Sequence, residues 1–182
     1  MPKLKRTQNP RSAWTTFLLV IGVSALFGFV VLPYLGKKNA LEGTHAPDFV
    51  LPVIHGGDPG NRIRLSDLRG KVVVVDFWAS WCVPCRTQAP IIDTLAKRHG
   101  DELAVVGVST NDERDAAVRF AKGQNLSYPM VFDENNRVAT EYSVTGLPTL
   151  VVVDKSGKIV AVRQRVVPET ELEALVGKAR GG

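Results

Sequence analysis

The stretch 72–90, VVVVDFWASWCVPCRTQAP, restricts the possible folds of this chain more than any other feature. Its first seven residues, four valines followed by Asp, Phe and Trp, are typical of a strand buried in a sheet. The apolar residues after Cys85 have helical spacing, so we expect a helix whose first turn carries Cys82 and Cys85. A buried strand that leads directly into a helix predicts an α/β fold with both cysteines at the junction.

The first turn of a helix is a favourable place for a thiolate. Backbone N–H groups without helical partners and the positive end of the helix dipole both stabilise an anion there. The pKa of Cys82 is therefore expected to be lowered, which makes this thiol a nucleophile near neutral pH. Cys85 follows three residues later and can close a disulfide with it. The pattern predicts a dithiol/disulfide redox centre.

Other interpretations of the cysteine pair have less support. Cys82 and Cys85 are the only 2 cysteines among 182 residues, so a structural disulfide framework is excluded. Tetrahedral zinc needs four ligands, and His45, His55 and His99 are scattered without ligand spacing. We therefore favour redox chemistry over a zinc site or an inert pair. No metal is expected, and no cofactor besides the Cys82–Cys85 disulfide.

The excess of positive over negative charge lies in the N-terminal part of the chain. The net charge is +5, and residues 1–43 alone hold six basic residues against one acidic residue. The remainder is balanced and has no basic patch in its sequence, so nucleic acid is not an expected partner.

Residues 14–35 form an uncharged apolar run, WTTFLLVIGVSALFGFVVLPYL. About 20 such residues suffice to cross a membrane as a helix. A cleaved signal peptide is the alternative, since Val23-Ser24-Ala25 resembles a cleavage site, but cleavage there would leave a very apolar N-terminus. Four basic residues precede the run and only Lys37 and Lys38 follow it closely, which predicts a cytoplasmic N-terminus. We expect an uncleaved single-pass anchor in the cytoplasmic membrane, with the remaining chain on the extracytoplasmic (periplasmic or outer) side.

The predicted organisation has four parts: a cytoplasmic basic segment 1–13, a transmembrane signal-anchor 14–35, a linker 36–47 and a single domain 48–182. The domain should open with a hairpin and then alternate strands and helices, which favours parallel pairing, with an antiparallel hairpin near its end. The expected strands are 48–54, 62–65, 72–78, 103–109, 130–132, 149–153 and 158–162, and the expected helices are 84–99, 112–122, 136–142 and 168–178.

Three blocks carry a resemblance to a known family. The opening Ala46-Pro47-Asp48-Phe49, the active-site block VDFWASWCVPCRTQAP and the later Thr145-Gly146-Leu147-Pro148-Thr149 resemble the thioredoxin superfamily, and within it the membrane-anchored thiol-disulfide oxidoreductases of the TlpA/ResA type. The resemblance implies a thioredoxin-like α/β fold with an N-terminal β-hairpin extension and a central helical insertion at 105–133.

The resemblance also implies roles for individual residues. Cys82 would attack a substrate disulfide and Cys85 would resolve the intermediate. Trp81 and Pro84 would shape the site. Leu147 and Pro148 would form a cis-proline ledge on which a substrate backbone docks.

Asp76 matches a buried acid of thioredoxins. Burial would raise its pKa, which suits it to exchange a proton with Cys85. The alternative is a solvated carboxylate at a strand end. Gln88 departs from the family, because many relatives carry a glutamate three residues after the second cysteine. Glutamine does not titrate, so any proton transfer by that glutamate is absent here.

Three functions follow from these observations. The first is reduction of disulfides in protein substrates, with re-reduction by a membrane electron-donor thiol protein, in a setting such as cytochrome c or respiratory-complex maturation. Oxidation of substrates would use the same residues, so the redox direction stays open. The second is a peroxiredoxin-like peroxide reductase, although a WCxxC motif does not match the usual peroxidatic cysteine. The third is a Cu(I) metallochaperone, which lacks accessory methionine or histidine ligands near the pair.

Overall fold

The computed structural model describes residues 10–28, 39–58 and 60–181. The chain divides into two compact units, Met1–Lys38 and Asn39–Gly182. The first contains helix α1 (Pro10–Leu26). Among the described residues, none of the helices combines the length and apolar character needed to span a bilayer. The predicted anchor 14–35 runs on into residues 29–35, which lie outside the described residues. Residues 1–9 of the predicted basic segment 1–13 lie outside them as well.

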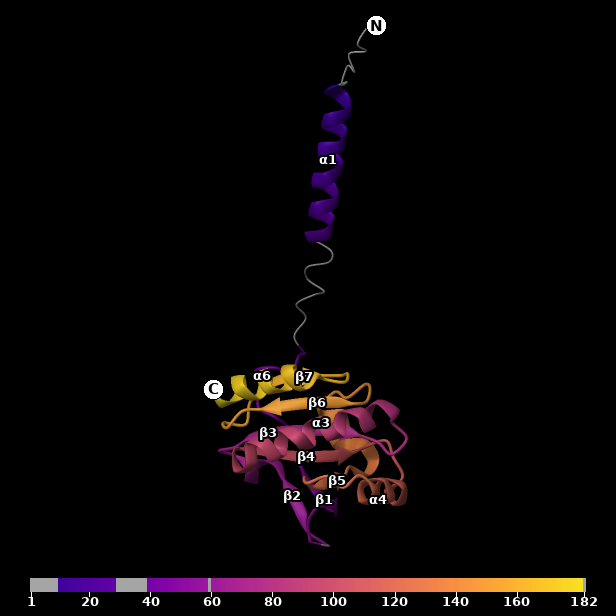
Figure 1. Ribbon diagram of the computed structural model, residues 1–182, viewed down its shortest axis with the longest axis vertical. Coiled ribbons are helices and arrows are strands. Elements are labelled where there is room, and N and C mark those ends of the chain that lie inside the picture. The colour runs from indigo at the N-terminus through magenta and orange to yellow at the C-terminus, as the bar shows by residue number, and fades with distance from the viewer. Residues whose placement is uncertain (1–9, 29–38, 59, 182) are drawn as a thin grey trace, which may run out of the picture. The chain divides into compact units, whose positions relative to one another are not determined.

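A seven-stranded sheet forms the centre of the second unit, in the order β2-β1-β5-β4-β3-β6-β7 within the described residues (Figure 1). The three middle strands β5, β4 and β3 are parallel, and every other pair is antiparallel. The strands are β1 (Val50–His55), β2 (Arg62–Arg64), β3 (Val72–Trp78), β4 (Leu103–Ser109), β5 (Met130–Phe132), β6 (Thr149–Val153) and β7 (Ile159–Arg163).

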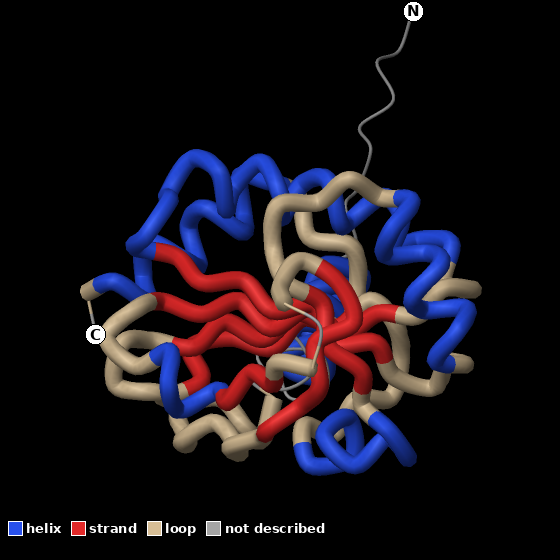
Figure 2. Tube along the Cα trace, turned by 90° about the horizontal axis from the view of Figure 1, so that it is seen from below, coloured by secondary structure: helices blue, strands red, loops and turns tan. Residues whose placement is uncertain are grey.

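Helices cover both faces of this sheet (Figure 2). Side chains of α3 (Val83–His99), α4 (Arg114–Gly123) and α6 (Glu169–Arg180) pack with Val72 and Val74 on one face. The other face packs with Val73 and Val75 under α5 (Arg137–Glu141). Short 3-10 turns complete the unit at Leu65–Leu68, Gly100–Glu102 and Glu134–Asn136. The result is a thioredoxin-like three-layer α/β fold, with β3 buried along its whole length.

Strand β6 runs antiparallel to β3, whereas the alternation of strands and helices favoured parallel pairing. The connection between β5 and β6 contains only the short helix α5, so the chain does not travel back along the sheet before β6 begins. Thr149 therefore lies opposite Phe77, at the end of β3 that leads to the cysteines. This reversal brings the loop before β6 to the site.

Residues 39–47 pack onto the sheet edge, although all of them were predicted to belong to the linker 36–47. The Gly43 N–H donates to the Ile159 carbonyl (2.8 Å), and the Ile159 N–H donates to the Thr44 carbonyl (2.8 Å). The second unit accordingly begins at Asn39. The extended N-terminal hairpin is also present, and its strand β1 joins the sheet through β5.

Candidate active site

Cys82 is the N-cap residue of α3, and Cys85 lies in the first turn of that helix. Pro84 lies between them, where a residue without an N–H group costs no helical hydrogen bond. The two sulfurs form a disulfide with an S–S distance of 2.02 Å. The Cys85 N–H also points at the Cys82 sulfur, with a nitrogen-to-sulfur distance of 3.2 Å. A thiolate on Cys82 would be stabilised by this hydrogen bond and by the positive end of the α3 dipole.

The disulfide is buried, but apolar side chains beside it are exposed. Cys82 and Cys85 are each 2% exposed, whereas Trp81 is 58% and Val83 is 72% exposed. Within the described part of the second unit, Trp81 and Val83 are the exposed large hydrophobic residues. Such an apolar surface directly beside a reactive sulfur suits contact with another polypeptide.

A neighbouring loop fixes the backbone before Cys82. The Ser80 hydroxyl donates to Asp112 (2.7 Å), which also accepts the Ser80 N–H (2.5 Å), and the Trp81 indole N–H donates to the Asn111 carbonyl (2.8 Å). From α3, the Arg86 guanidinium donates to the Ser80 carbonyl (3.2 Å). No local pattern in the sequence predicts these contacts. Asp112 was expected to begin a helix, but α4 begins two residues later and the Asp112 carboxylate binds Ser80.

The loop before β6 forms one wall beside the cysteines. The Leu147–Pro148 peptide bond is cis, in agreement with the expected conformation. The Thr149 hydroxyl donates back to the Gly146 carbonyl (2.6 Å) and closes this loop. A groove runs between the loop and the residue preceding Cys82; its lining residues are Trp81, Thr110, Asn111, Asn136, Ala139, Thr140, Val144, Thr145, Gly146 and Leu147.

Asp76 lies inside the protein and not at a solvated strand end. It is 2% exposed, and its Oδ1 has no hydrogen-bond partner among the described residues. Alternation along β3 places it on the same sheet face as Val74 and Trp78, whose side chains belong to the cluster that contains both cysteines. Burial raises the pKa of Asp76 from 3.8 to about 7. A carboxyl group of this kind gains and loses protons near neutral pH.

Trp78 belongs to the core, since it is 2% exposed and its ring lies 5.0 Å from that of Phe120 between centroids. The space for this indole depends on Gly107, where a Cβ atom would lie 3.1 Å from Trp78 Nε1. Trp78 therefore packs in the core, as the predicted buried strand 72–78 requires.

Gln88 is fully buried and binds one residue on another segment. Its Oε1 accepts the Val167 N–H (2.6 Å), and its Nε2 donates to the Val167 carbonyl (3.3 Å). From the sequence, we predicted only that position 88 carries no titratable carboxyl group. No local pattern points to Val167, which lies 79 residues away.

No group of three or more His, Cys, Asp or Glu side chains in the described ranges is arranged to hold a metal ion.

The family model for the AhpC/TSA family matches residues 43–162, which spans the hairpin, the cysteine pair and the strands that carry them. The chain belongs to this family. Its similarity to the thiol-disulfide oxidoreductase ResA of Bacillus subtilis is 32% identity over 164 residues, covering 88% of this chain and 87% of ResA. The thioredoxin-like protein YneN of Bacillus subtilis is also 32% identical, over 88% of this chain and 94% of YneN.

Solved structures agree with this family assignment. A protein described as a thiol:disulfide interchange protein DsbE of Chlorobium tepidum superposes with a TM-score of 0.70 at 29% identity, over 79% of this chain and 99% of that one. An exposed lipoprotein thioredoxin of Streptococcus pneumoniae gives a TM-score of 0.65 at 28% identity, over 72% and 99%. Together with the Cys82–Cys85 disulfide, these relationships make the protein a ResA-type thiol-disulfide oxidoreductase.

Proposed function

We propose that this oxidoreductase reduces disulfide bonds of protein partners on the extracytoplasmic side of the cytoplasmic membrane. The observation that carries the proposal is the position of Cys82, at the N-terminus of α3 and beside the exposed Trp81 and Val83. The helix end stabilises a thiolate, and the apolar surface offers contact to a polypeptide.

The first step is attack by the Cys82 thiolate on one sulfur of the substrate disulfide. A bond forms between Cys82 Sγ and that sulfur, and the substrate S–S bond breaks. The other substrate sulfur leaves as a thiolate and takes a proton from water. The groove beside Leu147 and Pro148 would hold the substrate backbone during this exchange.

The second step releases the substrate. Cys85 loses its proton and attacks Cys82 Sγ, so the mixed disulfide breaks and the Cys82–Cys85 disulfide forms again. The departing substrate sulfur is then protonated, and two electrons have passed to the substrate. Asp76, with its pKa raised to about 7, would accept the Cys85 proton in this step. A membrane thiol protein would restore the two thiols by the same exchange in reverse.

An N-terminal membrane anchor would hold this chemistry at the membrane. The proposal rests on the uncharged run 14–35 and on the excess of basic residues before it. Within α1, the large apolar side chains from Trp14 to Leu26 are at least 50% exposed, which suits a lipid environment. The similarity to ResA proteins suggests maturation of cytochrome c or of respiratory complexes as the setting.

The test uses the full chain in detergent, reduced with dithiothreitol and freed of excess reductant. We expect it to reduce the disulfides of insulin rapidly, whereas Cys82→Ser leaves the uncatalysed rate. Parallel assays measure peroxide consumption and Cu(I) binding. Peroxide turnover faster than insulin reduction, or tight stoichiometric copper without disulfide reduction, would replace the proposal with one of the two alternatives.

A further inference from the structure

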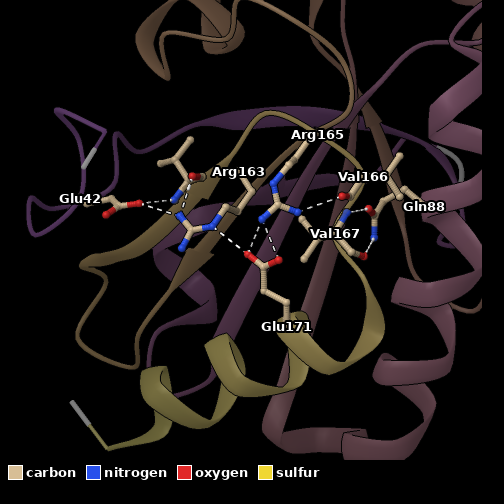
Figure 3. A network of polar contacts seen from close by, with 8 residues as sticks. Glu42, Gln88, Arg163, Arg165, Val166, Val167 and Glu171 are labelled. Carbon is tan, nitrogen blue, oxygen red and sulfur yellow. Dashed lines mark hydrogen bonds and ion pairs between the residues drawn. The ribbon is translucent and has the colours of Figure 1, made fainter. Parts of the chain in front are cut away.

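A short stretch between β7 and α6 contacts both walls of the active site. We name residues 164–167 the brace segment. At one end, Gln164 reaches the loop that leads to Pro148. At the other end, Val167 binds Gln88 of α3 (Figure 3). The cysteines lie on α3 and the substrate ledge on the loop, so the brace segment links the two parts that must meet around a substrate.

The contact with α3 needs a side chain that both accepts and donates a hydrogen bond. Gln88 and Val167 are both 0% exposed, so no bulk water can replace a lost partner. The Val167 backbone has one donor and one acceptor, and the Gln88 amide pairs with both. The Val167 N–H donates to Gln88 Oε1 (2.6 Å), and Gln88 Nε2 donates to the Val167 carbonyl (3.3 Å). A carboxylate would satisfy the N–H group but would face the carbonyl with negative charge. An apolar side chain would leave both groups unpaired.

Gln164 makes two hydrogen bonds to the loop before β6, which carries Leu147 and Pro148. The Gln164 Nε2 donates to the Ser143 carbonyl (3.2 Å), and its Oε1 accepts the Thr145 hydroxyl (2.6 Å). Both partners precede Leu147 and Pro148 by a few residues. A shift of the brace segment would thus be transmitted to the ledge.

Charged side chains fix the brace segment from outside. Glu171 of α6 accepts hydrogen bonds from Arg163 Nε (3.0 Å) and from Arg165 Nη2 (2.7 Å), while Arg165 Nη1 donates to the Val166 carbonyl (3.1 Å) (Figure 3). Arg163 also binds Glu42 (3.0 Å). The hydrogen bond from Arg165 leads the causes that lower the pKa of Glu171, so this carboxylate stays ionised and paired. These contacts hold the brace segment in place, so it has little freedom to move when the side chain at position 88 is changed.

We propose that Gln88 is a positioning residue that, through the brace segment, keeps the first turn of α3 and the Pro148 loop at the spacing a polypeptide substrate requires. This inference rests on the proposed reduction of protein disulfides. It concerns docking of the substrate chain and not the reactivity of Cys82. Substrates that need the ledge should therefore respond to a change at Gln88, and small disulfides should not.

The first experiment compares Gln88→Met with the native chain on two substrates, a fluorogenic peptide disulfide and hydroxyethyl disulfide. The full chain in detergent is used, with dithiothreitol as electron source. We expect kcat/KM for the peptide to fall roughly fivefold to tenfold, mainly through KM, since the loss corresponds to about one buried hydrogen-bonded contact. Turnover of hydroxyethyl disulfide should change less than about twofold.

The second experiment uses Gln88→Glu across the acid-to-neutral pH range. A protonated carboxyl group reproduces both hydrogen bonds of the amide, and an ionised one does not. The ratio of peptide to hydroxyethyl disulfide turnover cancels the titration of Cys82, Cys85 and Asp76, because both substrates use the same thiols. We expect a native ratio at acid pH and a reduced ratio at neutral pH.

Thr87→Glu is the matched control, because Thr87 is exposed and adjacent to Gln88 on α3. It adds the same charge at the neighbouring position of α3, away from the contact between Gln88 and Val167. Its ratio should stay native at every pH.

Three results would overturn the inference: equal losses on both substrates in Gln88→Met, a Gln88→Glu ratio without pH dependence, or the same pH dependence in Thr87→Glu. If Gln88→Met does not fold, Gln88→Glu and its control decide alone. Failure of the proposed function is distinct, because the native chain itself would then reduce neither disulfide.

Discussion

Asp76→Asn should stabilise the protein strongly above neutral pH and hardly at all in acid. The pKa of Asp76 rises from 3.8 to about 7 on folding because burial disfavours its charge. The folded state therefore binds a proton that the unfolded chain releases, and this contribution to stability is present below pH 3.8 and is lost as pH rises through about 7. A shift of about three units at 1.36 kcal/mol each gives about 4 kcal/mol. Asparagine has nearly the same shape and never ionises, so the variant avoids this loss.

Urea unfolding of the oxidised full chain in detergent, followed by tryptophan fluorescence, measures the difference in the free energy of unfolding. The advantage of Asp76→Asn should be close to zero at about pH 4 and should grow to roughly 3–4 kcal/mol at about pH 8. Glu134→Gln serves as the control, since Glu134 is exposed and removal of its charge should give no such trend. A pH-independent difference, or none at all, would refute the assignment of a neutral-range pKa to Asp76.

Four further results are expected. Asp76→Asn should slow release of the mixed disulfide by about tenfold or more near neutral pH, measured by quenched-flow trapping, and unchanged release would exclude the proton relay. Cys85→Ser should accumulate the Cys82–substrate adduct in mass spectra of non-reduced samples, and absence of an adduct would contradict the attack-and-resolve order. Asp112→Ala should lower the free energy of unfolding by about 1–3 kcal/mol, because the bonds to Ser80 are lost; an unchanged urea midpoint would contradict this. Leu26→Arg should move the protein out of the membrane fraction, since a charge near the middle of the span costs about 3 kcal/mol, and full retention would argue against the anchor.

The sequence predicted best what depends on neighbouring residues. The apolar run 72–78 and the helix after it follow from local periodicity, and they alone place Cys82 and Cys85 in the first turn. Burial of Asp76 could be anticipated because apolar residues flank it on both sides.

What the sequence could not predict are contacts between distant segments. Gln88 binds Val167, Asp112 binds Ser80, and Glu42 binds Arg163, which lies 121 residues away in the chain. None of these pairs is marked by a periodic or local sequence pattern. Arg163 of the edge strand β7 likewise pairs with two carboxylates, those of Glu42 and Glu171. The general expectation of parallel pairing does not hold for β6, because the direction of this strand depends on where the preceding connection leaves the chain.

The reduction potential of the Cys82–Cys85 couple tests the central claim most directly. The full chain in detergent is equilibrated in thiol/disulfide buffers, and the oxidised fraction is measured by alkylation of free thiols and mass spectrometry. A protein that reduces its partners should have a potential near that of thioredoxin, about −270 mV. A value near that of DsbA, about −120 mV, would make it an oxidant of proteins and would contradict the proposed direction of electron flow.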